Sequence, residues 1–129
     1  MTTSEPLSIR ETREGAVHRL IPIGELDLAT APLLENAFSA ALRDEQTDMI
    51  VMDLTELSFM DSTGIRLLVQ MHGACQAADR LRVINGSRAV ERILDISGVR
   101  AQLPIISSDQ DPLAPLNAPR GTADESPTA

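Results

Sequence analysis

The sequence contains no tryptophan or tyrosine and only two phenylalanines, so aromatic stacking cannot organise a ligand site. Aromatic residues make up 2% of the chain against 43% for all hydrophobic residues, and the core must therefore be aliphatic. Lysine is also absent, because all eleven basic residues are arginine, and nineteen acidic residues bring the net charge to −8. Such an acidic chain, without an extended basic block, is unsuited to bind nucleic-acid backbones or anionic membranes.

Cysteine is scarce as well, since Cys75 is the only one, and no cysteine and histidine residues have the spacing of metal ligands. This excludes an internal disulfide and a zinc site, indicates no cofactor, and makes Cys75 a small core residue. The first residues, Met1 to Glu5, lack the basic and apolar regions of a signal peptide. No apolar run approaches the ~18 residues that a membrane-spanning helix needs. We therefore expect a cytoplasmic protein.

The chain is long enough for one domain with a substantial core. From Ser107 to Ala129 the apolar periodicity is lost, and four of the eight prolines occur there. This composition is typical of a disordered tail. The folded domain is therefore expected to run from Leu7 to Ile106.

Strand and helix patterns alternate in the first half of this domain. Residues 16–23 form a β-rich run that Gly24 is expected to end, and Pro22 suggests a strand end, an edge or a bulge. Thr30 is placed to cap a helix that stops near Asp44. The inward face of this helix is predicted to carry Leu33, Leu34, Ala37, Phe38, Ala41 and Leu42.

The second half continues the alternation. Residues 49–52 form an uninterrupted apolar run, typical of a central strand buried on both faces. After a connection over 53–60, a helix is expected from Asp61 or Ser62 to about Ala78. Three elements then follow: a strand over 81–84, a helix capped by Ser87 and closed by Gly98, and a strand over 103–106. This alternation predicts an α/β fold.

The segment from Phe59 to Gly64 places acidic, hydroxyl and glycine residues where a connection meets a helix N-terminus. The free N–H groups and the positive dipole end there can receive a phosphate on Ser62 without breaking the helix. Arg66, Gln70 and Gly73 share the helical stripe of Ser62, which therefore heads an exposed polar strip. The inward face of the same helix is expected to hold Leu68, Met71, His72 and Cys75.

Spacing alone leaves Ser62 open to two interpretations, an ordinary helix cap or a regulatory site. The missing side chain of Gly64 leaves room for another backbone to come close. Asp27, taken alone, is a turn or cap residue.

Catalysis by Ser62 is disfavoured. Met60 stands two residues before it, where a nucleophile elbow requires glycine. His18 and His72 are the only histidines that could act as a base, and their positions on a strand and on an inward helix face suit surface or core roles. The sequence therefore indicates a binding protein and not an enzyme.

Three stretches carry a family resemblance: DLTELSFMDSTG at 53–64, GELD at 24–27 and SRAVERILDISG at 87–98. Together they resemble STAS-domain anti-sigma factor antagonists, which include the sporulation and general-stress regulators of Gram-positive bacteria. The resemblance covers about residues 16–106. It implies a STAS-like mixed sheet of about four to five strands packed with three to four helices, followed by the disordered tail.

By this resemblance, the unphosphorylated protein binds an anti-sigma factor that is also a serine kinase, and so frees a sigma factor. The kinase would phosphorylate Ser62 and thereby inactivate the protein, and a PP2C-type phosphatase would reverse the reaction. The resemblance and the polar strip together assign partner binding to Asp27, Met60, Asp61, Ser62, Thr63, Gly64, Arg66 and Gln70.

The sequence departs from the family pattern at Pro22, where relatives keep an ordinary strand residue, and in the tail that replaces a final helix. A STAS domain can also serve a transporter, a lipid-trafficking complex or a stressosome-like assembly. The free serine after Asp61 and the lack of a membrane segment favour the sigma-regulatory branch.

Overall fold

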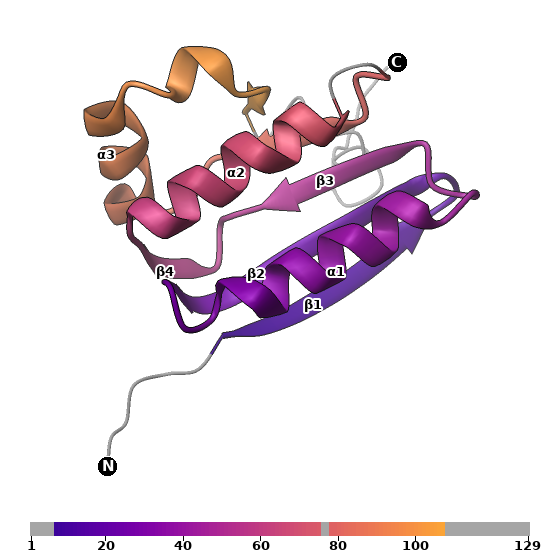
Figure 1. Ribbon diagram of the computed structural model, residues 1–129, viewed down its shortest axis with the longest axis horizontal. Coiled ribbons are helices and arrows are strands. Elements are labelled where there is room, and N and C mark those ends of the chain that lie inside the picture. The colour runs from indigo at the N-terminus through magenta and orange to yellow at the C-terminus, as the bar shows by residue number, and fades with distance from the viewer. Residues whose placement is uncertain (1–6, 76–77, 108–129) are drawn as a thin grey trace, which may run out of the picture.

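The computed structural model describes residues 7–75 and 78–107 (Figure 1). Helices and strands alternate through this part of the chain, as the sequence predicts. In chain order they are β1 (Ser8–Glu14), β2 (Val17–Leu26), α1 (Ala31–Arg43), β3 (Met49–Asp53), β4 (Leu57–Met60), α2 (Ser62–Cys75), β5 (Leu81–Ile84), α3 (Arg88–Ser97), the 3₁₀ turn η1 (Arg100–Gln102) and β6 (Ile105–Ile106). The tail predicted over 107–129 lies, apart from Ser107, outside the described residues.

The six strands form a mixed sheet in the order β1-β2-β3-β5-β6, with β4 paired to β2. Among the strand pairs of the described residues, only that of β1 with β2 is antiparallel, and the others are parallel. The predicted central strand is β3, whose residues are almost all buried. The structure thus confirms the α/β mixed sheet.

Gly24 does not end the second strand, and that prediction is wrong. Residues 17–20 of β2 pair with β3, residues 24–26 pair with β4, and the register shifts between Gly24 and Glu25. Gly24 has a φ of +117°, a backbone conformation that only glycine adopts readily. Pro22 lies in the gap between the two pairings, next to the bulge that its missing N–H suggests. The bulge therefore lets one long strand pair with two others.

Two strands are absent from the sequence prediction. The strand β1 carries alternating charges and is exposed along most of its length, so it lacks the buried face that marks a strand. The strand β4 lies within 53–60, which the sequence assigns to a connection, and has only four residues. Both form because β2 offers them hydrogen-bonding partners.

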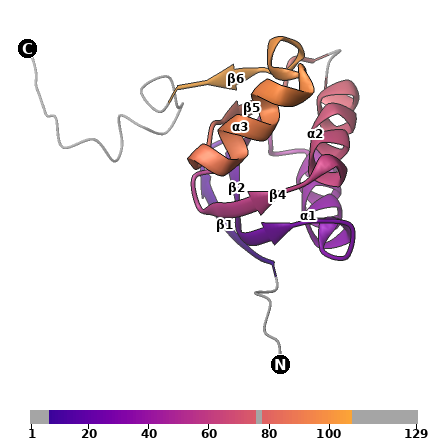
Figure 2. The ribbon, with the colours of Figure 1, turned by 90° about the vertical axis from the view of Figure 1, so that its left-hand side faces the viewer.

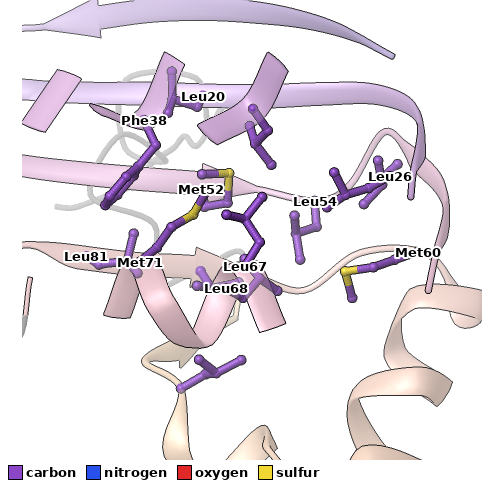
Figure 3. Close-up of a cluster of buried hydrophobic side chains, with 14 of the residues drawn as sticks. Leu20, Leu26, Phe38, Met52, Leu54, Met60, Leu67, Leu68, Met71 and Leu81 are labelled. Atoms are coloured by element: carbon purple, nitrogen blue, oxygen red, sulfur yellow. The ribbon is translucent and has the colours of Figure 1, made fainter. Parts of the chain in front are cut away.

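The helices α1 and α2 lie side by side on one face of the sheet (Figure 1) and enclose a core that is aliphatic apart from Phe38 (Figure 3). The buried residues of α1 are Ala31, Leu34, Phe38 and Ala41. The prediction for Leu33 is wrong, because it lies about 100° around the helix from Leu34 and is 51% exposed. On α2, Leu68, Met71 and Cys75 are buried as predicted, whereas His72 is only half-buried.

Cys75 is 2% exposed, which confirms its assignment to the core. Burial raises the pKa of its thiol above the ordinary value. The thiol therefore stays neutral, and Cys75 acts as a small apolar residue on the buried face of α2.

The third helix, α3, lies beside β4 (Figure 2). As predicted, the Ser87 hydroxyl accepts a hydrogen bond from the Val90 N–H at 3.4 Å, and Gly98 ends the helix at a φ of +76°. The last strand is shorter than predicted, because residues 100–102 form a 3₁₀ turn and only Ile105 and Ile106 pair with β5. None of the helices within residues 7–75 and 78–107 has the length and hydropathy needed to cross a membrane.

Candidate partner-binding site

Two aspartates leave the sheet at the same edge. Leu26 of β2 lies opposite Met60 of the parallel strand β4, so the next residues, Asp27 and Asp61, emerge together at the carboxyl ends of the strands. The Asp61 N–H donates to the Leu26 carbonyl at 3.2 Å. This bond holds the N-terminus of α2 beside the loop that leads into α1.

Asp61, and not Ser62, caps α2. Its Oδ1 accepts from the Thr63 N–H at 2.9 Å and from the Gly64 N–H at 3.4 Å. Ser62 is the first helical residue and is exposed. Among the described residues, no group bonds to the Ser62 hydroxyl. The hydroxyl is therefore available to a partner, while Asp61 stabilises the helix start.

The polar strip that the sequence predicts is confirmed, because Ser62, Arg66, Gln70 and Gly73 are all exposed along α2. Thr63, at the edge of this strip, is half-buried.

Two predicted site residues lie beneath this surface. Met60 is 2% exposed, and Gly64 is buried. A Cβ on Gly64 would come 2.3 Å from the Met60 Cγ and 3.0 Å from the Leu26 Cδ2. Gly64 therefore makes room for two side chains, and not for a second backbone as the sequence suggests. Met60 and Gly64 seat the first turn of α2 against the end of β2.

Asp27 fixes the loop between β2 and α1. Its Oδ1 accepts from the N–H groups of Ala29 and Thr30, each at 3.0 Å. Thr30 occupies the predicted cap position of α1, but its hydroxyl does not cap the helix and donates instead to the Glu25 carbonyl at 2.8 Å. The turn interpretation of Asp27 is thus confirmed. The loop it holds leaves Leu28 77% exposed.

A groove of about 320 Å³ lies between α1 and α2, next to Ser62. Leu28, Ala31, Pro32 and Glu35 line one side, and Thr63, Arg66, Leu67 and Gln70 line the other. The sequence prediction contains none of the residues on the α1 side. No local sequence pattern could show that these residues face α2, because β3 and β4 lie between α1 and α2 in the chain.

The first aspartate of the stretch over 53–64 has a structural role. Asp53 is buried and its Oδ2 accepts from the Arg19 Nη1 at 2.8 Å. Its Oδ1 accepts from the N–H and the hydroxyl of Thr55, which shapes the turn between β3 and β4. Asp53 therefore stabilises the turn between β3 and β4. This turn positions β4, and Ser62 follows at the end of that strand.

No group of three or more potential ligand residues within the described part of the chain could hold a metal ion. The site consists of the unengaged Ser62 hydroxyl, two aspartates, an exposed polar strip and a groove. Such a surface is suited to binding another protein.

Asp61→Ala should lower the free energy of unfolding by about 1 kcal/mol, because it removes the acceptor for two N–H groups of the first turn. Asp61→Asn should lose less, since its side-chain oxygen can still accept those bonds. Urea unfolding followed by circular dichroism measures both. Equal stability of all three proteins would contradict the capping role of Asp61.

A family model for the STAS domain matches residues 11–111. The anti-sigma F factor antagonist of Paenibacillus polymyxa is 30% identical over 94 residues, which make up 72% of this chain and 80% of that protein. Among solved structures, an anti-sigma factor antagonist from Mycobacterium paratuberculosis matches with a TM-score of 0.71 at 24% identity, covering 80% of this chain and 89% of that one. The Bacillus cell fate determinant SpoIIAA in the phosphorylated form matches with a TM-score of 0.63 at 19% identity, covering 88% of this chain and all of that one.

Proposed function

The chain belongs to the STAS-domain family as a homologue of anti-sigma factor antagonists, and from this membership we propose that it binds an anti-sigma factor through the surface around Ser62. Binding would leave the sigma factor free to join RNA polymerase in the cytoplasm. Antagonists of this kind are regulators and not enzymes. The chemistry at Ser62 therefore comes from the partners: the anti-sigma factor acts as a serine kinase, and a PP2C-type phosphatase removes the phosphate.

The observation that carries this proposal is the placement of Ser62 as the first residue of α2, exposed and with its hydroxyl unengaged among the described residues. A kinase can reach this hydroxyl without unfolding the chain. The helix cap survives the modification because Asp61 provides it. The phosphorylated form of SpoIIAA has this same fold. This similarity supports the inference that the fold can carry a phosphate without unfolding.

The other residues of the site take complementary roles in the proposal. Arg66 and Gln70 present polar groups to the partner along the strip, and Thr63 lies at its edge. Asp27 and Asp61 hold the two segments that meet at Ser62. Met60 and Gly64 act from below, where they set the position of the first turn.

Ser62→Ala should abolish kinase-dependent phosphate incorporation and leave the protein bound to the anti-sigma factor in the presence of ATP. Because Asp61 caps the helix, the loss in unfolding free energy should stay below the ~1 kcal/mol of a lost cap. The measurement is incubation with the purified anti-sigma kinases of the host and ATP, followed by peptide mass spectrometry and a pull-down.

Thr12→Ala is the control, since it removes an exposed hydroxyl on β1, outside the proposed site, and should still be phosphorylated at Ser62. Continued phosphate incorporation into Ser62→Ala would count against Ser62 as the site. Recovery of transporter or stressosome-like subunits in place of an ATPase-type kinase would instead assign the chain to another branch of the family.

A further inference from the structure

The loop before α1 has a hydrogen-bonded backbone and presents an apolar side chain to water. Leu28 is 77% exposed, although the residues on both sides of it are held by the Asp27 carboxylate and by the Thr30 hydroxyl bond to the Glu25 carbonyl. These bonds hold the backbone on both sides of Leu28, so its side chain projects from an ordered loop. A preorganised apolar group loses little freedom when a partner covers it.

Leu28 stands at the rim of the groove between α1 and α2, and the base of that groove is apolar. Ala31 and Leu67 line it and are only 8% and 5% exposed. Its lining residues recur at intervals of three and four on each helix, so the groove follows the helix axes for about two turns, or roughly 10 Å. It is long enough for a short segment of another protein.

The two sides of the groove carry opposite charges. Glu35 lies on the α1 side and Arg66 on the α2 side, both exposed. Neither has an ion-pair partner among the described residues, and they are not paired with each other. A segment that enters the groove can therefore pair a basic group with Glu35 and an acidic group with Arg66.

We propose that this groove docks an apolar side chain of the anti-sigma factor, flanked by one basic and one acidic residue, with Leu28 as the main apolar contact. The inference rests on the proposed function, because it concerns the same partner. The groove is continuous with the Ser62 surface, since Arg66 and Gln70 belong both to the groove and to the polar strip. A kinase that reaches Ser62 therefore lies over the groove as well.

The test compares Leu28→Asp with Ile96→Asp, using as probe the purified host anti-sigma factor that binds the wild-type chain most tightly. Ile96 is the matched control, since it is 75% exposed but lies on α3. Isothermal titration calorimetry should show Leu28→Asp binding at least tenfold more weakly and Ile96→Asp binding within twofold of wild type. Circular dichroism checks that both variants are folded, as expected for exposed positions.

Charge reversal gives an independent measurement. Arg66→Glu and Glu35→Arg should each weaken binding severalfold, and amide resonances of residues 28–35 and 63–70 should shift when the partner is added to the wild-type chain. Wild-type affinity for Leu28→Asp, or shifts confined to α3, would overturn the groove proposal while leaving the role of Ser62 intact. Failure of the wild-type chain to bind any host anti-sigma factor would overturn the proposed function itself.

Discussion

Phosphorylation of Ser62 should weaken binding of the anti-sigma factor by at least a hundredfold while the domain stays folded. The phosphate adds a charge of about −1.5 to −2 at the N-terminus of α2, where N–H groups and the helix dipole stabilise it. The unbound, modified chain therefore tolerates the charge.

The complex should not tolerate the phosphate in the same way. A docked partner would confine it at the sheet edge where Asp27 and Asp61 emerge together, which adds desolvation and like-charge repulsion to steric exclusion. A hundredfold change corresponds to about 2.8 kcal/mol, which one desolvated charge can supply. Arg66, one helical turn after Ser62 on the strip, would balance part of the phosphate charge in the free protein.

The measurement is the affinity of the unmodified and the fully phosphorylated chain for the same anti-sigma factor, together with amide chemical shifts of both forms. Shifts should be confined to the start of α2 and the loop around Asp27. Equal affinities would remove the switch. Shifts spread across the β3 and β5 core would replace this local mechanism with a global conformational change.

Asp53→Ala should lower the unfolding free energy by at least about 2 kcal/mol, the largest loss among the variants proposed, because it removes a buried charged hydrogen-bond partner. The Arg19 and Asp53 side chains are 8% and 12% exposed and lie 2.8 Å apart on neighbouring strands. Removal of the carboxylate takes a close counter-charge from a buried guanidinium and also frees the turn that Thr55 shares with Asp53. For a domain of this size, the melting temperature should fall by more than about 8 °C.

Asp95→Ala serves as the control for this prediction. Asp95 pairs with Arg100 at 3.3 Å on the surface, where its side chain is 57% exposed, and such pairs contribute about 0–1 kcal/mol. Thermal unfolding of both variants distinguishes the two cases. If the variants lost similar stability, the buried pair would have no special role in holding β2 to β3.

The sequence by itself determined the elements whose burial follows a local pattern. The apolar run of β3, the inward face of α2 except for His72, and the Ser87 and Gly98 ends of α3 are confirmed, because each signal lies within one element. The location of Ser62 at a helix start is predictable for the same reason. The partner-binding roles of the residues around it stay predictions.

Only the tertiary structure decided which of several local possibilities occurs. The strands β1 and β4 exist because β2 pairs with them, and Gly24 continues β2 as a bulge because β3 and β4 meet different halves of that strand. Asp61 caps α2 because the hydrogen bond from its N–H to the Leu26 carbonyl fixes where the helix starts. The groove beside Ser62 needs α1 and α2 to pack against each other. Strand pairing and helix packing join residues far apart in the chain, and short-range periodicity carries no information about such contacts.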